Sequence, residues 1–96
     1  MLESFMDNIK IVEAKTFKDK LLGFMFKKSA DYAILFEKCN GIHTFFMRFN
    51  IDVIFMDKNK SVIKEVKNLK PWRIAVCFKA HYVLEIPSKK KVEREE

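Results

Sequence analysis

Two acidic side chains stand inside apolar stretches of this 96-residue chain. Asp52 directly precedes Val-Ile-Phe, and Glu85 is flanked by Leu and Ile. A carboxylate that enters an apolar strand must find a partner, or its pKa rises. With the imidazole of His43, such a pair can perform general acid and base catalysis, so a hydrolase is one hypothesis. We favour a structural alternative, in which Asp52 bonds backbone amides at a bend and Glu85 pairs with a base such as Arg48, because no nucleophile is visible beside a base.

A second pattern combines thiols and imidazoles. Cys39 and His43 have the same spacing as Cys77 and His81. Two thiolates and two imidazoles form a common zinc ligand set. Residues i and i+4 of one strand lie about 13 Å apart, however, whereas zinc ligands converge to about 2 Å from the ion. We therefore expect free thiols in apolar surroundings, no bound metal and no cofactor.

Basic residues are concentrated in one part of the chain. The 19 Lys and Arg outnumber the 13 Asp and Glu, which gives a net charge of +6, and residues 58–79 hold Glu65 as their only acid. Such a local excess attracts anions, although a solvated lysine surface is the simpler interpretation. Single-stranded nucleic acid is the alternative partner, because small β barrels bind it through exposed rings and lysines. The residues for such a site are Lys60, Lys64, Lys67, Lys70, Trp72 and Arg73.

Short alternating segments must position these residues. The apolar pattern predicts strands at about 8–14, 33–37, 42–56, 61–66, 72–78 and 81–86. Asn50 is the expected bend within the third of them, and Asn59 is expected to take positive φ in the turn that precedes the fourth. In so short a chain these strands predict an α+β, mostly β fold, with a curled antiparallel or mixed sheet that closes toward a barrel.

One short helix is predicted between the first two strands. Thr16 is its expected N-cap, and Asp19 stands at the position where an acid favours the helix start. Gly23 is expected to end it. The residues Phe17, Leu21 and Phe24 then form one apolar stripe that packs on the sheet.

Length and composition bound the class of protein. With 49% apolar residues the chain is too hydrophobic for intrinsic disorder, and 96 residues suit one domain, here expected at 1–87 with a charged, frayed tail at 88–96. No apolar run is long enough to span a bilayer. Glu3 and Asp7 interrupt the segment where a signal peptide is apolar, so we expect a cytoplasmic protein.

The order of several motifs resembles a known family. Ala14 and Thr16 lead into a helix that ends in Gly-x-Met, and an apolar strand ends at Phe36. The most specific block is the His-Thr-x-x-Met-x-x-x-x-Asp run within 42–52, and Leu-Lys-Pro-Trp-Arg at 69–73 and Val-Leu-Glu-Ile-Pro at 83–87 follow it. This pattern is similar to the bacterial and archaeal DUF192 family, a domain of unknown function. The resemblance covers nearly the whole chain.

The resemblance implies a small barrel-like β fold with a short helix or two, and it brings no established activity. It also marks the polar or soft positions within the shared motifs, which are His43, Thr44, Met47, Asp52 and Glu85. One sheet can gather these side chains around a groove. The leading hypothesis is therefore a cytoplasmic, non-enzymatic binding or accessory domain, with a small ligand or a protein as partner. The family usually has glycine near Asn59, which is absent here.

Overall fold

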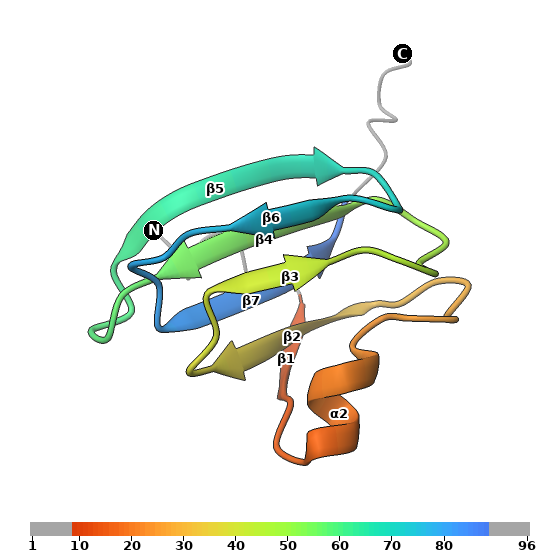
Figure 1. The fold of residues 1–96 in the computed structure, drawn as a ribbon. Coiled ribbons are helices and arrows are strands. Elements are labelled where there is room, and N and C mark those ends of the chain that lie inside the picture. Colours follow the sequence, from red (N-terminus) through yellow and green to blue (C-terminus); the bar gives the residue numbers. More distant parts are fainter. Residues whose placement is uncertain (1–8, 89–96) are drawn as a thin grey trace.

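The computed structural model describes residues 9–88 of the chain. In this part of the chain the fold is mostly strand, as predicted, with a single short helix (Figure 1). The elements in order are β1 (Lys10–Glu13), α2 (Phe17–Leu22), β2 (Tyr32–Glu37), β3 (Gly41–His43), β4 (Ile51–Met56), β5 (Val62–Leu69), β6 (Ile74–Val76) and β7 (Tyr82–Pro87).

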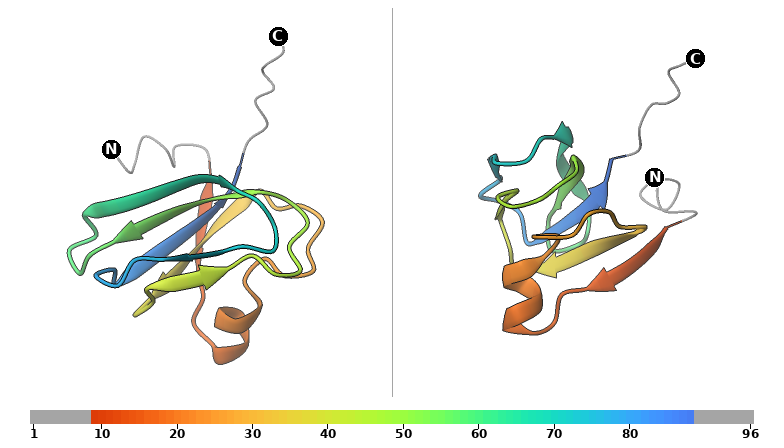
Figure 2. Two further views of the ribbon diagram at one scale, coloured as in Figure 1. Left: turned by 45° about the horizontal axis from the view of Figure 1, so that its top comes forward. Right: turned by 90° about the vertical axis from the view of Figure 1, so that its right-hand side faces the viewer.

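The strands form two sheets that lie one over the other. The larger sheet has the order β1-β2-β7-β4-β5, with β1 parallel to β2 and the other pairs antiparallel, so it is mixed. The smaller sheet is the antiparallel pair β3-β6. Figures 1 and 2 show this pair lying across one face of the larger sheet, with α2 beside the end that holds β1 and β2.

Closure of the sheet into a barrel is not confirmed. Within residues 9–88, the larger sheet has two ends, at β1 and β5, and β3 and β6 pair only with each other. The ammonium of Lys64 on β5 donates to the backbone oxygen of Val76 on β6 over 3.0 Å. A side chain therefore connects β5 with β6 where a barrel would have a ladder of backbone hydrogen bonds.

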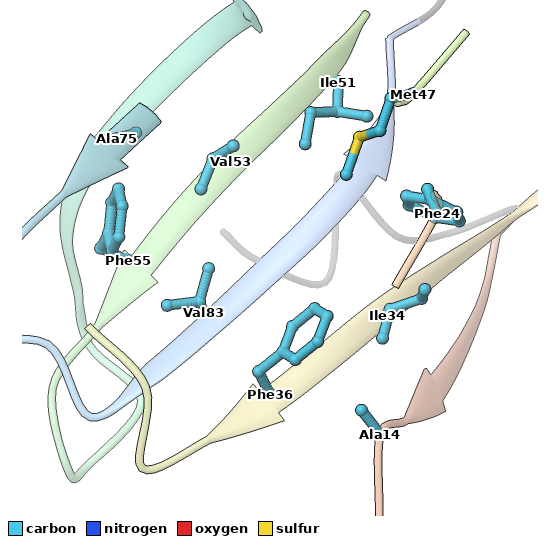
Figure 3. Packing of buried hydrophobic residues seen from close by; sticks show 10 residues of the cluster. All are labelled: Ala14, Phe24, Ile34, Phe36, Met47, Ile51, Val53, Phe55, Ala75 and Val83. Atoms are coloured by element: carbon cyan, nitrogen blue, oxygen red, sulfur yellow. The ribbon is translucent and has the colours of Figure 1, made fainter. Parts of the chain in front are cut away.

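The core fills the space between the two layers. Alternate residues of the central strands point into it, among them Val53 and Phe55 of β4 and Val83 of β7, all of which have no exposed surface (Figure 3). Ala75 of β6 and Met47 cover them from the opposite side. A second buried cluster, made of Ala33, Ile54, Met56 and Leu84, occupies the other face of the large sheet. Both faces of β4 are thus apolar, which explains its nearly continuous hydrophobic sequence.

The helix has the predicted ends. Thr16 accepts a hydrogen bond from the amide of Asp19 (3.0 Å) and Asp19 reciprocates, while Gly23 follows the last turn at φ +48°. The expected apolar stripe is wrong at Leu21, which is 57% exposed. Phe24 is buried as expected, but it lies beyond the end of the helix. The bend at Gly23, and not the face of the helix, therefore directs its ring into the core. The side chain of Phe17, the first residue of the predicted stripe, lies outside the described part of the structure.

The predicted long strand at 42–56 is two strands in different sheets. β3 ends at His43, β4 begins at Ile51, and a loop rather than a bend at Asn50 joins them. The predicted positive φ also lies one residue further along, at Lys60 (+65°) rather than Asn59. The physical reason is Asp57, whose carboxylate accepts the amides of residues 59 and 61 and fixes the turn.

The first residue of the predicted tail, Ser88, forms two hydrogen bonds with the rest of the domain. Ser88 is attached to the sheet, because its amide donates to the backbone oxygen of Asn50 over 3.0 Å and its hydroxyl donates to Asp52 over 2.7 Å. The rest of the predicted tail, residues 89–96, lies outside the described residues, as do residues 1–8.

Candidate ligand-binding cavity

Glu85 is a buried acid in the core. It lies on β7 two residues after Val83, so the alternation of the strand turns both side chains toward the inner face. Only 2% of Glu85 is exposed, and within residues 9–88 its Oε1 atom has no hydrogen-bond partner. Burial raises the pKa of this carboxyl from 4.5 to about 8. Arg48, expected as its partner, is exposed and forms no ion pair with it in this part of the chain.

A cavity of about 90 Å³ opens beside this carboxyl. Its walls come from α2 and the bend after it, from β2 and β3, and from the loop before β4. The exposed Lys20 and Leu21 stand at its rim. The lining residues are Lys20, Leu21, Leu22, Gly23, Met25, Phe36, Cys39, Gly41, Ile42, His43, Met47 and Glu85.

Gly23 lies close to the carboxyl of Glu85 on the side of α2. A Cβ atom on this residue would lie 3.5 Å from Oε1 of Glu85 and 3.5 Å from the ring of Phe36. Both distances are ordinary van der Waals contacts, so the backbone of Gly23 packs close to the buried acid and to Phe36. Two larger hollows, of about 290 and 220 Å³, flank α2, but neither is lined by a buried ionisable side chain. The smaller cavity is the chemically distinctive one.

Cys39 shares the cavity with Glu85. Its thiol contacts the backbone oxygen of Gly41 at 3.2 Å. Burial raises the pKa of Cys39, the backbone of Gly41 opposes this, and the negative charge of an ionised Glu85 raises it further. The thiol therefore stays protonated at neutral pH and is a poor nucleophile. The sequence predicted a free thiol in apolar surroundings, with zinc binding as the alternative, but it did not predict Cys39 as a neighbour of Glu85.

Two of the predicted groove residues join Glu85 in this cavity. His43 accepts the amide of Phe45 at its Nδ1 atom over 3.1 Å, which leaves the proton of the neutral ring on Nε2. Met47 is 5% exposed and supplies a soft apolar wall. Lys20 and Gly23 are among the lining residues that were not predicted from the sequence, because only the tertiary structure brings α2 and the bend after it beside Glu85 of β7.

Thr44 lies outside the cavity and holds two loops together. It has no exposed surface, its hydroxyl donates to the backbone oxygen of Lys70 over 2.7 Å, and it accepts the amide of Arg73 over 2.8 Å. A threonine buried with its hydroxyl fully used joins the start of the 44–50 loop to the segment that leads into β6. The side chain therefore has a structural role.

Asp52 also lies outside the cavity, on the opposite face of the sheet. It pairs with Ile86, whereas its neighbour Val53 pairs with Glu85. Its Oδ1 atom accepts the amide of Asn68 over 2.9 Å and the hydroxyl of Ser88 over 2.7 Å. This agrees with the expectation that Asp52 bonds backbone amides. The groove expected from five side chains therefore contains His43, Met47 and Glu85.

Two of the four zinc candidates, Cys39 and His81, are joined through their backbones. The amide of Cys39 donates to the oxygen of His81, and the amide of Cys77 donates to that of Asn40. The side chains diverge, since Cys39 faces the cavity and His81 lies 3.6 Å from the carboxylate of Glu37. No group of three His, Cys, Asp or Glu side chains in residues 9–88 is placed to hold a metal ion.

The candidate polyanion residues are divided between surfaces. Lys60 lies over the ring of Tyr82, which packs on the outer cluster, whereas Lys64 lies over the ring of Phe55 in the inner core. Lys67, Lys70 and Arg73 are exposed, and Trp72 is 55% exposed.

The fold and the cavity define a class of small two-layer, mostly β domain with a buried acid beneath a short helix. Solved structures share this fold. A protein of unknown function from Novosphingobium aromaticivorans DSM 12444 superposes with a TM-score of 0.70 at 18% identity, over 88% of this chain and 67% of that one. A protein from Sinorhizobium meliloti 1021, described as a candidate transcription regulator, gives 0.72 at 16% identity, over 86% and 71%. At such identity the likeness supports the fold alone.

Sequence comparison gives the family. The model of DUF192, described as an uncharacterized ACR, matches residues 2–94, and the chain belongs to this family. The UPF0127 protein PH1112 of Pyrococcus horikoshii is 44% identical over 77% of this chain and 69% of its own length. The UPF0127 protein PYRAB11210 of Pyrococcus abyssi is 41% identical over 81% and 71%. The resemblance predicted from the motifs is thereby confirmed. In residues 9–88 we find no helix long and apolar enough to cross a membrane.

Proposed function

We propose that this chain is a ligand-binding domain and that its site is the cavity at Glu85. The ligand presents a hydrogen-bond donor, an amine or a hydroxyl, to Oε1 of this residue. The observation that carries the proposal is that Oε1 is buried at a cavity and has no partner within residues 9–88. A buried acceptor left unpaired costs about 1–3 kcal/mol, and native structures keep few such groups without a functional reason.

The lining restricts the ligand further. A volume of about 90 Å³ has room for a group of a few heavy atoms, or for the end of a larger molecule. Phe36, Ile42 and Met47 make most of the inner wall apolar. A short aliphatic amine or alcohol fits this combination of one buried acid and hydrocarbon walls. An ammonium group binds with ionisation of Glu85, so its binding releases a proton near neutral pH.

Small probes test the proposal. Protein labelled with ¹³C at the glutamate carboxyls and at the methionine methyl groups is titrated with ethylammonium, ethanol and propionate, and the NMR signals of Glu85 and Met47 are followed. We expect ethylammonium or ethanol to shift these signals saturably, and propionate to leave them unchanged. Glu85→Leu, which replaces the acid by an apolar residue of similar size, abolishes the shifts, whereas the control Asp52→Asn retains them. Equal shifts in Glu85→Leu, or none with any probe, contradict the proposal.

The hydrolase alternative retains Glu85 and His43 and excludes Asp52, which lies on the other face. The raised pKa of Cys39 leaves the cavity without an activated nucleophile from that residue. A binding role needs neither a nucleophile nor a second acid. It is therefore the function that these contacts support best.

The nucleic-acid alternative rests on Trp72 and Arg73, which are both exposed. It predicts an affinity for poly(U) that falls steeply with salt and is lost in Trp72→Ala. An affinity that does not change with ionic strength contradicts it.

A further inference from the structure

The segment around β6 turns its large apolar side chains outward. Trp72, Ile74, Val76 and Phe78 are 55%, 65%, 41% and 82% exposed, whereas the intervening Ala75 is buried. An ordinary surface strand does the opposite, with its larger apolar residues against the core. The arrangement gives β6 an apolar outer face.

Two further rings extend this face. The rings of Trp72 and Phe46 lie 4.7 Å apart between centroids, and those of Phe46 and Phe26 lie 5.2 Å apart. Phe46 and Phe26 are 47% and 63% exposed. We use the term apolar band for Phe26, Phe46, Trp72, Ile74, Val76 and Phe78. The ring of Phe46 contacts the other two rings, and exposed apolar groups that cluster mark an interaction site more often than scattered single residues do.

The backbone holds three of these rings in place at a cost. Phe26, Phe46 and Trp72 have φ values of +68°, +65° and +66°, a region that is unfavourable for bulky side chains. Hydrogen bonds fix the conformation, since Phe26 donates its amide to the oxygen of Phe46 over 2.9 Å and Trp72 donates to the oxygen of Thr44 over 3.0 Å. Strained residues that the fold nevertheless maintains are concentrated at functional sites.

The segments that carry the apolar band hold charges of one sign. The segments 26–28, 43–48 and 70–79, which carry the band, contain no Asp or Glu. They contribute six bases, all exposed, which are Lys27, Lys28, Arg48, Lys70, Arg73 and Lys79. A partner for this surface therefore combines negative charge with an apolar interior.

We propose that the apolar band docks the protein on the surface of an anionic lipid bilayer. The rings and the aliphatic side chains enter the interfacial region, where Trp and other aromatic residues are favoured, and the bases contact headgroup phosphates. A second copy of the chain is a poorer partner, because it would bring two basic surfaces together. Single-stranded nucleic acid stacks on rings, but it leaves Ile74 and Val76 without a role.

Trp72 is the only tryptophan in the chain, so its fluorescence reports on the band directly. The full chain is titrated with vesicles of equimolar phosphatidylcholine and phosphatidylglycerol, and with vesicles of phosphatidylcholine alone. With the anionic vesicles we expect a blue-shifted tryptophan emission and co-sedimentation of the protein. Replacement of one base, as in Arg73→Glu or Lys79→Glu, should weaken partitioning onto these vesicles at least about fivefold. Ile74→Ser combined with Phe78→Ser lowers partitioning by at least about tenfold.

Matched substitutions control for unspecific effects. Ile11→Ser and Lys10→Glu change an exposed apolar residue (42%) and an exposed base on β1, at the opposite end of the large sheet from β5, and both retain vesicle binding. The replaced residues are exposed in every variant, and thermal unfolding checks that each is folded. Equal binding to neutral vesicles overturns the proposal, and so does unchanged partitioning of the double variant at Ile74 and Phe78. The third contrary result is that the protein binds poly(U), or associates with itself, and does not bind vesicles.

Discussion

Glu85 and Asp52 are one register step apart on adjacent strands and point to opposite faces of the sheet. Glu85 pairs with Val53, and Asp52 pairs with Ile86. Because side chains alternate along a strand, the first carboxyl enters the core beside the cavity, and the second reaches the amide of Asn68. The two acids therefore serve separate purposes, which mutations can distinguish.

The stability of the protein should depend on pH through Glu85. Its pKa is raised to about 8 in the folded chain and returns to about 4.5 when the chain unfolds, so between these values the folded state holds a proton that the unfolded state has lost. The contribution of Glu85 to stability is complete below pH 4.5 and falls as the pH rises toward 8, by up to about 1.4 kcal/mol per pH unit.

Glu85→Gln removes this titration. We expect the free energy of unfolding of the variant to increase relative to that of the wild type as the pH rises from 4.5 to 8. Urea unfolding followed by circular dichroism, measured across that pH range, checks this. The difference between the two proteins isolates Glu85 from the other acids. Parallel stability profiles would show that the carboxyl is not buried in its neutral form.

Loss of the Asp52 carboxylate should destabilise the fold and leave the cavity unchanged. Asp52→Ala removes the acceptor for the amide of Asn68 and the hydroxyl of Ser88, and we expect a loss of about 1.5–3 kcal/mol in the free energy of unfolding. Asp52→Asn keeps an oxygen for that amide and should lose less. Denaturant unfolding measures both, and a change of the Glu85 NMR signals in either variant would contradict the separation of the two sites.

Thr44 should be intolerant of a change that keeps its shape. Thr44→Val leaves the backbone oxygen of Lys70 and the amide of Arg73 without their partner, with an expected cost of about 1–3 kcal/mol. Thr44→Ser keeps the hydroxyl and should cost less, although it loses a buried methyl group. Urea unfolding gives the free energy of unfolding of both variants, and we expect Thr44→Val to be the less stable of the two. If serine is the more damaging substitution, packing rather than hydrogen bonding explains the burial of this residue.

The substitution Lys60→Gly should stabilise the hairpin. Lys60 has φ +65°, which is strained for a side chain with a Cβ atom, and its ammonium lies over the ring of Tyr82. We expect the relief of this strain to outweigh both the lost ring contact and the added conformational freedom of the unfolded chain. The free energy of unfolding should therefore rise by about 0.5 kcal/mol. Lys58→Gly, in the same turn but without positive φ, should be destabilising. A thermal melt of the two variants compares them directly.

Local sequence predicted most of the elements. The alternation around Glu85 and the apolar run after Asp52 predicted β7 and β4, and Thr16 and Gly23 predicted the two ends of α2. These signals involve neighbouring residues only. The division of residues 42–56 into two strands was not predicted, because it depends on the contact of Thr44 with a segment about thirty residues away.

The sequence by itself placed Glu85 within an apolar last strand, because its neighbours on both sides are apolar. The tertiary structure decided which face that acid would occupy, that Gly23 and Cys39 would meet it there, and that Asp52 would be turned away. Register fixes the face of every side chain in a sheet, and it follows from pairing between distant strands. The same long-range pairing places Ala75 inward and leaves Trp72 and Ile74 at the surface, which an alternating pattern cannot specify.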